Sequence, residues 1–531
     1  MTNKQNRLLS LILEHFMISL DVYEDEENEE TFTHEKLTEY TNLTLCQYLR
    51  SGSSAEKLYL PFSNHVKSDI DLMFEFPYIY VVDPEQFTSN ERQKYKANNQ
   101  IRFLYLDYSN KKYPCYVTLY YYSMQELIVT NEKTDSSHLL PGTNKYIIPG
   151  DFIDPYRKYF LSSRLVNWMK NQWPIDEDND EELEIHGPSI CITSKNSNFP
   201  LPMDHVTSLK CIHWPKSARH WINRVRISNW PEQNLINSII KFGCHLVPIP
   251  HLLSTSKIQS IEWRLSFSIC ELLLAKTLSY YQRKCYLIVK ALFDVHIKQD
   301  LELSKLICSY YLKTILFWLC ESIEKEQWTY ETLYDRFIEF INYIIVCFEK
   351  KRLKHYFIPE MNLIHHFNDE QLKKLIEKCI LMKNNLLTMI EQCEEYYWNT
   401  NQFKRFNPII EVLVKNENFN ENSCIIWFYG HTMHAFIKQH QLTDRPLKMV
   451  KDCIKRNYLE LCSNESAKYL LYVTSLIANI LHDKNIYSVE NLSVHNAMMK
   501  ICDAKLFYDQ NFEDIKTNYI EIQNHLNNEN K

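Results

Sequence analysis

SGSSAEKLYLPFSNHVKSDIDLMFEF, residues 51–76, places two aspartates, Asp69 and Asp71, one residue apart in an apolar run. Two carboxylates so close repel each other unless a cation neutralises them. Oxygen ligands of this kind suit Mg²⁺ or Mn²⁺. The stretch therefore predicts that Asp69 and Asp71 hold a divalent metal ion.

The run that starts at residue 70 is typical of a β-strand, in which alternate side chains lie on the same face. The alternation predicts that four apolar side chains point into a core: Ile70, Leu72, Phe74 and Phe76. It predicts the opposite face for Asp69, Asp71, Met73 and Glu75. An exposed strand with two solvated acids is the alternative that the local pattern leaves open.

Gly52, one of only 6 glycines in the chain, precedes this strand together with Ser53. Glycine permits a tight turn and lets backbone N–H groups approach a phosphate. The segment SAEKL at 54–58 favours a helix, whose N-terminus attracts anions. A phosphate-binding turn followed by paired acids is the arrangement that phosphoryl or nucleotidyl transfer needs, and a plain turn is the alternative.

Composition bounds the class of protein. The 531 residues are 45% hydrophobic and 13% aromatic, which is enough for packed cores and about two to four domains. The formal charge of −7 argues against coating of nucleic acid by bulk charge, but not against a local basic patch. Neither GxGxxG nor GxxxxGK(S/T) occurs, which excludes the Rossmann and Walker fingerprints.

Cysteine usage and hydropathy predict a cytoplasmic protein. The 16 cysteines form no CxxC pair, and no signal peptide is recognisable, so reduced thiols are expected. The longest apolar run, 306–320, is interrupted by Lys313, so no membrane span is expected.

An α–β region followed by helices predicts an α+β fold. Residues 5–20 and 34–50 show helical periodicity, and aromatic, β-branched segments between 70 and 122 are typical of a sheet. Beyond residue 215 long apolar-periodic segments predict helices, among them SIEWRLSFSICELLLAKTL at 260–278. We expect three domains, with a ligand cleft between the first two. Their predicted bounds are 1–212, 213–395 and 396–531, the last with a frayed tail.

Six further blocks follow the opening stretch in a fixed order. They are HGPSICIT, DHVTSLKCIHWP, GCHLVPIPH, EWRLSFSICE, CSYYLKTILFW and HYFIPEMNLI, beginning at residues 186, 204, 243, 262, 308 and 355. Together with Gly52-Ser53 and the paired acids, residues 45–395 resemble the polymerase β-like nucleotidyltransferases, and in particular the Mab-21 family. That family includes cyclic GMP-AMP synthase and the cGAS-like receptors.

The resemblance implies a bilobal nucleotidyltransferase core with a mixed sheet, a helical HhH/H2TH-like lobe and a helical C-terminal extension. It implies an enzyme that joins two nucleoside triphosphates, ATP or GTP, into a cyclic dinucleotide second messenger of innate immunity with Mg²⁺ or Mn²⁺. In such enzymes a third carboxylate completes the metal site, and the matching position here is Asp204. Double-stranded RNA or DNA is the trigger that the resemblance implies.

The resemblance also assigns residues that contact nucleotide. Gly52 and Ser53 match the triphosphate turn, and the pair Arg264 and Ser266 matches base-contacting positions. Three further matches lie in the helical region: Lys290 on the triphosphate, Ser309 near phosphate, and Tyr310 stacking on a purine. A surface-reaching lysine and a plain core or edge tyrosine are the alternatives for Lys290 and Tyr310.

The chain departs from vertebrate cyclic GMP-AMP synthase where that enzyme carries a zinc-binding insertion. The corresponding interval contains only two cysteines, Cys270 and Cys285, and no histidine, so we expect no zinc. Cysteine–histidine pairs elsewhere fit no structural zinc spacing and are expected to be buried structural residues: Cys211 with His213, and Cys244 with His245.

Two basic segments are the candidates for nucleic-acid contact. The first, 216–226, contains Lys216, Arg219, Arg224 and Arg226, and the second spans 350–354. Such cations can bind phosphate backbones, and an ordinary solvated helix face is the alternative.

Two functions therefore compete. The first is an active nucleotidyltransferase, and the second is a catalytically silent Mab-21-like protein that acts as a binding or developmental signalling module. A transferase acting on RNA ends shares the acid pair but not the downstream blocks. The identity of the joined nucleotides and the oligomeric state lie beyond what the sequence predicts.

Overall fold

The computed structural model describes residues 6, 9–10, 12–13, 47–60, 70–96, 101–109, 112–121, 153–154, 159–160, 162, 181–186, 189–194 and 203–398. The chain divides into two compact units, Asp25–Met389 and Met1–Glu24 with Ile390–Lys531. Several predictions lie outside the described residues: the metal ligand Asp69, the burial of Ile70 and Phe76, most of the predicted helices 5–20 and 34–50, and nearly all of the predicted domain 396–531.

The larger unit contains a mixed sheet and a set of helices, which confirms the α+β content. The strands are β1 (Gln47–Ser51), β2 (Ile70–Val82), β3 (Arg102–Asp107), β4 (Tyr116–Tyr120), β5 (Ile153–Asp154), β6 (Tyr159–Phe160), β7 (Glu181–His186), β8 (Ser189–Ser194), β9 (Met203–Cys211), β10 (Cys244–Val247) and β11 (Glu262–Ser266).

Among the helices, several follow the predicted apolar periodicity of the second half of the chain. The α-helices are α3 (Gly52–Ala55), α4 (Ser89–Lys96), α6 (Arg219–Ile222), α7 (Gln233–Phe242), α8 (Ser256–Gln259), α9 (Ser268–Ala275), α10 (Tyr280–His296), α11 (Ser309–Ser322), α12 (Leu333–Glu349), α13 (Asp369–Asn384) and α14 (Leu386–Trp398). Two 3₁₀ helices are η4 (Lys216–Ala218) and η5 (Lys325–Gln327).

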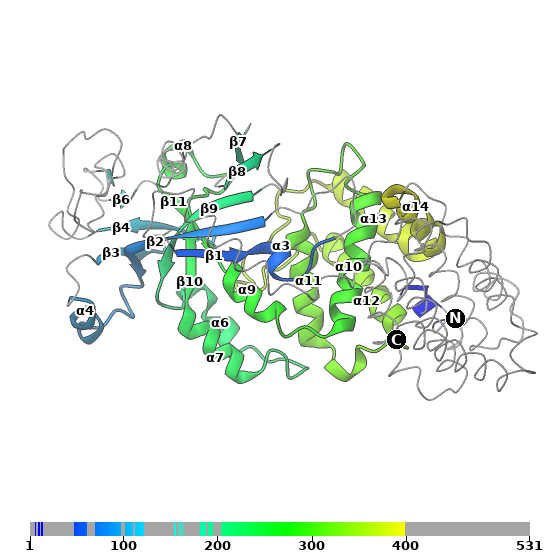
Figure 1. Ribbon diagram of the computed structural model, residues 1–531, viewed down its shortest axis with the longest axis horizontal. Coiled ribbons are helices and arrows are strands. Elements are labelled where there is room, and N and C mark those ends of the chain that lie inside the picture. The colour runs from blue at the N-terminus through cyan, green and yellow to red at the C-terminus, as the bar shows by residue number, and fades with distance from the viewer. Residues whose placement is uncertain are drawn as a thin grey trace, which may run out of the picture. The chain divides into compact units, whose positions relative to one another are not determined.

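The sheet is arranged around the long strand β2. Its first half pairs antiparallel with β1 on one side and parallel with β9 on the other. Its second half pairs parallel with β3 and, at Tyr80 and Val81, again with β9. Further pairings run from β3 through β4, β11 and β10 back to β9, so six strands form a closed circuit. Figure 1 shows β1, β2 and β9 side by side, with α3 at the end of β1 nearest α10 and α11. This arrangement places the opening stretch next to both the sheet and the helices.

The helical prediction for 260–278 is partly wrong. Residues 262–266 form β11, which pairs with β10 and β4, and only the segment from Ser268 continues as helix α9. The sheet thus extends past residue 212, where we placed the end of the first domain. The reason is that both faces of β11 are covered, so its residues join an apolar run that periodicity cannot separate from a buried helix.

Two further differences concern the opening stretch. The end of the predicted helix 34–50 is strand β1, because pairing with β2 overrides local helical periodicity. Leu72 and Phe74 are buried as predicted, but Met73 is buried as well, so the acid-bearing face is partly covered. The strand also continues through Pro77 to Val82 as one element, with an irregular register between Glu75 and Tyr80.

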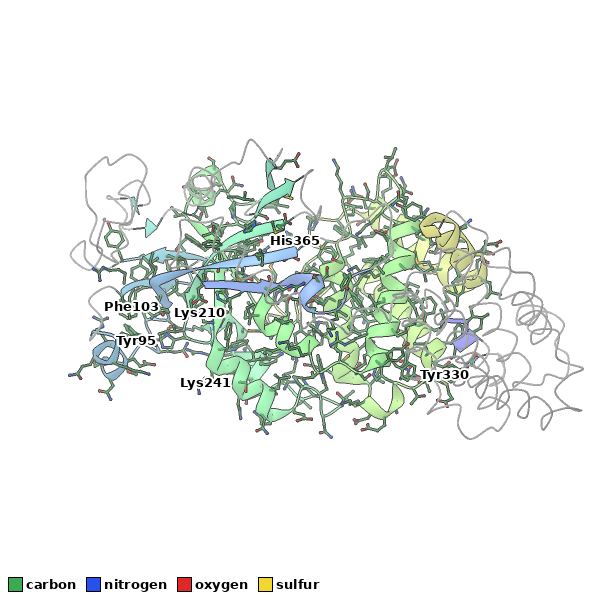
Figure 2. The ribbon with its side chains drawn as sticks, in the orientation of Figure 1. Tyr95, Phe103, Lys210, Lys241, Tyr330 and His365 are labelled. Atoms are coloured by element: carbon green, nitrogen blue, oxygen red, sulfur yellow. The ribbon has the colours of Figure 1, made fainter. Side chains whose placement is uncertain are left out.

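Aromatic side chains fill the contacts between the elements. Tyr95 of α4 and Phe103 of β3, labelled in Figure 2, pack edge to face with ring centroids 5.7 Å apart. In the helical part, Trp221 and Phe357 lie 5.0 Å apart at the centre of a larger cluster. Within the described residues, no helix combines the length and hydropathy needed to cross a bilayer.

Candidate functional site

Asp71 and Asp204 lie opposite each other on the neighbouring parallel strands β2 and β9. Paired positions on adjacent strands are about 4.8 Å apart and present their side chains to the same face. Both residues are half-buried. Oδ1 of Asp204 is buried without a hydrogen-bond partner. A buried carboxylate oxygen without a donor is the environment that a cation satisfies.

The turn at Gly52 packs directly on Asp71. Gly52 has φ +74°, and a Cβ atom at this position would lie 1.7 Å from Oδ2 of Asp71. Glycine is therefore required at position 52 for two reasons. The positive φ strains other residues, and no side chain fits in the space beside Asp71. The structure thus brings the predicted phosphate turn and a predicted metal ligand into contact.

Backbone hydrogen bonds make the turn a compact unit. Glu56 donates its N–H to the Gly52 carbonyl at 3.0 Å, and Leu58 donates to the Ser53 carbonyl at 2.8 Å. Arg50 adds a side-chain bond to Oγ of Ser54 at 3.1 Å. The helix α3 is a single turn of four residues, so Ser53 has no extended helix behind it.

Two cations of α10 reach the end of this turn. Lys290 donates from Nζ to the Leu58 carbonyl at 2.6 Å, and Arg283 donates from Nη1 to the Glu56 carbonyl at 2.5 Å. Lys290, which the resemblance assigns to triphosphate, therefore lies beside the predicted phosphate turn. Its amine contacts the turn's own backbone in this conformation.

A buried ionic triad joins the turn to two helices. Nζ of Lys313 on α11 lies 2.7 Å from Oε1 of Glu56 and 2.8 Å from Oε2 of Glu271 on α9. All three residues are at most 9% exposed. Burial raises the pKa of Glu56, although Lys313 acts against it. Burial lowers the pKa of Lys313, but Glu271 and Glu56 together outweigh it and raise the pKa above its ordinary value.

Tyr310 extends this triad. Its hydroxyl group lies 2.8 Å from Nε2 of His355, and the centroid of its ring lies 5.6 Å from Nζ of Lys313. Nδ1 of His355 accepts bonds from the N–H groups of Phe357 and Ile358, both at 3.1 Å, so Nε2 carries the proton and donates to Tyr310. Burial, reinforced by Glu271, raises the pKa of Tyr310 well above its usual value. The tyrosine is therefore a neutral, anchored side chain.

The other predicted nucleotide contacts lie nearby on β11 and α11. Arg264 pairs across the sheet with Tyr116; burial raises the pKa of the Tyr116 hydroxyl, and the charge of Arg264 acts against that shift. Oγ of Ser266 lies 3.0 Å from Oγ of Ser268. Ser309 is the first residue of α11, and its carbonyl accepts a bond of 3.4 Å from Tyr286.

Sequence reasoning did not select Glu56, Lys313 or His355, and it left Glu271 aside because acids are common on helices. The available signal was weak: Lys313 interrupts the apolar run 306–320, and Glu271 interrupts the run that continues into α9. A charged side chain inside an apolar helical face indicates a buried partner, but periodicity does not identify which one.

Asp71 and Asp204 supply two of the three predicted carboxylates. Where the chain is described, no group of three or more His, Cys, Asp or Glu residues is arranged to hold a metal ion. The third ligand, Asp69, is not among those residues. The acidic oxygens that are described fit Mg²⁺ or Mn²⁺ by their chemistry, and the unpartnered Oδ1 of Asp204 leaves a position for one.

The cysteine–histidine pairs are buried structural residues, as predicted. Cys211, His213, Cys244 and His245 are all buried. His213 accepts a bond from the Asp83 N–H at 3.1 Å, and His245 lies 2.8 Å from Glu75. One ring nitrogen of each histidine therefore serves a contact within the protein.

The basic segment 216–226 has its cations paired with acids. Lys216 lies 2.6 Å from Glu85. Arg224 and Arg226 both contact Oε1 of the buried Glu321, at 2.6 and 3.0 Å. The fourth cation, Arg219, lies 3.7 Å from Asp83. This pairing leaves little uncompensated charge in the segment for a phosphate backbone.

The segment 350–354 differs, because four of its side chains are exposed cations: Lys350, Lys351, Arg352 and Lys354. Lys351 pairs with Asp369 at 2.6 Å, and both partners are largely exposed. Such a surface pair is weak and exchanges readily with other charges. The second segment is therefore the better of the two candidates for contact with a polyanion.

Comparison with known proteins divides the larger unit into two parts. Residues 86–275 match the Mab-21 protein nucleotidyltransferase domain, and residues 281–380 match the Mab-21 protein HhH/H2TH-like domain. The first match includes Asp204 but begins after Gly52 and Asp71. Those two residues are linked to the matched domain by structure: Asp71 pairs with Asp204, and Gly52 packs on Asp71.

Curated relatives carry the same family name. The chain is 31% identical over 154 residues to Protein mab-21-like of Aedes aegypti, covering 28% of this chain and 40% of the relative. It is 24% identical over 239 residues to Protein mab-21-like 3 of Danio rerio, covering 44% of this chain and 55% of the relative. The chain thus spans about half the length of the curated relatives it matches.

Proposed function

Because the chain contains a Mab-21 nucleotidyltransferase domain followed by a Mab-21 HhH/H2TH-like domain, we propose that the protein is a two-lobed, polymerase β-like nucleotidyltransferase that makes a cyclic dinucleotide. In each half of this reaction a ribose hydroxyl oxygen of one nucleotide bonds to the α-phosphorus of another, and the bond to pyrophosphate breaks. Two such steps close the ring, and two pyrophosphates leave.

The observation that carries the proposal is the contact of three elements. Asp71 on β2 and Asp204 on β9 are paired, and Gly52 packs on Asp71. A phosphate-binding turn against two carboxylates is the geometry that this chemistry needs, because the acids hold cations next to the triphosphate. Since the matched domain begins at residue 86, the turn and Asp71 support the proposal independently of that match.

Asp71 and Asp204, together with Asp69, would hold Mg²⁺ or Mn²⁺. When bound, the metal supplies positive charge that offsets the phosphate oxygens and the developing charge on the leaving group. The chain's own residues bind and orient the substrates, which we propose to be ATP or GTP. Ser53 lies in the phosphate turn, Lys290 contacts the end of that turn, and Tyr310 offers a ring whose hydroxyl is anchored.

We propose further that a double-stranded nucleic acid activates the enzyme through segment 350–354. The support is the cluster of four exposed cations there, in contrast to the paired cations of 216–226. Phosphate backbones are bound mainly through such charges.

The test is incubation of the purified chain with labelled ATP, GTP, CTP and UTP, Mg²⁺ or Mn²⁺, and duplex RNA or DNA. We expect a cyclic product from the wild type. In Asp71→Asn and Asp204→Asn the rate of product formation should fall at least about 100-fold, because substitution of residues that only support metal ligands already lowers activity by up to about that factor. Asp107→Asn is the control, because Asp107 bonds Ser109 and Thr118 on the far side of β3 from β2.

Absence of product with every nucleotide and duplex would reject the enzyme. The remaining candidate would then be a catalytically silent binding or signalling module built on the same two domains.

A further inference from the structure

A continuous chain of buried polar contacts runs from the Gly52 turn to Tyr310. Glu56 ends the turn and contacts Lys313. Lys313 contacts Glu271, and its Nζ also lies 5.6 Å from the centroid of the Tyr310 ring, whose hydroxyl bonds His355. These contacts run from the Gly52 turn, which follows strand β1, to the helices α11 and α9. Their central member is Lys313.

Lys313 is the only member whose charge can hold the two buried carboxylates together. Its amine bonds both oxygens of Glu56, at 2.7 and 3.0 Å, and one oxygen of Glu271 at 2.8 Å. Without this cation, two buried carboxylates would face each other, and buried like charges repel strongly. Arg283 and Lys290 bond backbone carbonyls of the turn, and the charge of Lys290 also favours ionised Glu56, but Lys313 is the cation that bonds both carboxylates.

Backbone hydrogen bonds also couple the position of Glu56 to the positions of Gly52 and Ser53. Glu56 donates its N–H to the Gly52 carbonyl, and two residues later Leu58 donates to Ser53. A shift of Glu56 therefore moves the turn that packs against Asp71.

We propose that Lys313 is a positioning residue that sets the Gly52–Ser53 turn for triphosphate and links its order to the Tyr310 ring. The identity of the ligand, a nucleoside triphosphate, rests on the proposed function. The coupling between Lys313 and the order of the turn does not. Lys313 is buried between Glu56 and Glu271, so we expect it to act through these two carboxylates and not by contact with the triphosphate.

The test compares Lys313→Met and Lys313→Arg with a control at a second buried ion pair, whose acid lies on the same helix α11. Glu321 of α11 is bound by Arg226 at 3.0 Å and by Arg224 at 2.6 Å, so Arg226→Met also removes a buried ion pair but leaves the acid partnered. Amide hydrogen exchange is measured for peptides that cover residues 50–60, alongside the thermal unfolding of each variant.

We expect exchange at Glu56 and Leu58 to become about tenfold faster or more in Lys313→Met, as local opening without global unfolding would produce. Arg226→Met should leave these amides unchanged, and Lys313→Arg should restore protection because it keeps the charge. Binding of ATP with Mg²⁺, measured by calorimetry, should weaken about tenfold in Lys313→Met and recover in Lys313→Arg.

Unchanged exchange at 50–60 in a folded Lys313→Met protein would overturn the inference. If that variant does not fold, Glu56→Gln replaces it, since the substitution removes one buried charge and keeps the shape and the pair of Lys313 with Glu271. Should the wild type bind no triphosphate, the proposed function fails, whereas hydrogen exchange still decides whether Lys313 orders the turn.

Discussion

Gly52 and Asp71 are in such close contact that a Cβ atom on Gly52 would lie 1.7 Å from a carboxylate oxygen of Asp71. One residue belongs to the turn that we propose to bind phosphate, and the other to the strand that we propose to bind metal. A substrate phosphate and its cation are thereby held within one small region. Two properties of Gly52, the missing side chain and the positive φ, make this contact possible.

Gly52→Ala should abolish triphosphate binding and reduce the free energy of unfolding. A non-glycine residue at positive φ costs about 1–3 kcal/mol, and here the added methyl group also displaces Asp71. Gly243→Ala is the matched control, because Gly243 has φ +80° and its Cβ would lie 2.2 Å from the Cys211 carbonyl oxygen. Calorimetry with ATP and Mg²⁺ should show a loss for the first variant only, and equal losses would contradict the role of Gly52.

Tyr310→Phe should destabilise the protein while keeping the ring for stacking. Removal of the hydroxyl leaves Nε2 of the buried His355 without its partner, which costs about 1–3 kcal/mol, whereas Glu271 keeps its contact with Lys313. Tyr310→Leu should in addition weaken nucleotide binding. Chemical denaturation and ATP titration separate the two effects, with Tyr311→Phe as the control, since that neighbouring ring packs on Phe367. A nucleotide affinity unchanged in Tyr310→Leu would argue against stacking.

Stability should fall as the pH drops from about 6.5 to about 4. Burial lowers the pKa of His355 to about 4, whereas a histidine in the unfolded chain titrates near 6.5. Glu271 opposes this shift, and Arg264 and Arg224 add to it. In this window the unfolded chain binds a proton that the folded protein does not, so protonation favours unfolding by up to about 3 kcal/mol at the acid end.

Denaturant titrations across this pH range test the assignment. His355→Gln should reduce the pH dependence of the free energy of unfolding by an amount that corresponds to the uptake of about one proton, because glutamine does not titrate. The control is His220→Gln, since His220 is exposed. An identical slope in His355→Gln and the wild type would show that other buried groups account for the acid sensitivity.

Neutralising the exposed cations of 350–354 should weaken duplex binding. For Lys350→Gln with Lys354→Gln we expect a lower affinity for duplex RNA and DNA. For DNA, the slope of log K against log salt should decrease by about 0.9 per lost phosphate contact. Lys216→Gln with Arg219→Gln removes two cations that are paired with Glu85 and Asp83, and should change the slope little. If this control pair had the larger effect, the binding surface would lie on the first segment.

Much of the local structure around the candidate site follows from the sequence. Alternation predicts the strand that carries Asp71, and the burial of Leu72 and Phe74 agrees with it. The apolar periodicity of α10, α11 and α12 predicts three long helices. These features depend on neighbours a few residues apart, which is the range over which periodicity carries information.

Periodicity fails where pairing with a distant strand decides the structure. The segment 262–266 reads as the beginning of a helix and is strand β11, because β4 and β10 lie on either side of it. The end of the predicted helix 34–50 becomes β1 for the same reason. Short segments without strong turn signals take the conformation that their tertiary neighbours require.

The sequence by itself determined the residue types: a rare glycine before paired acids, and charged residues inside apolar helices. Only the tertiary structure decided their partners. It set Asp204 beside Asp71 through the pairing of β2 with β9, and joined Lys313 to Glu56 across 257 residues of chain. The physical reason is that a buried charge requires a partner but does not specify which one, so the choice belongs to the packing of the whole unit.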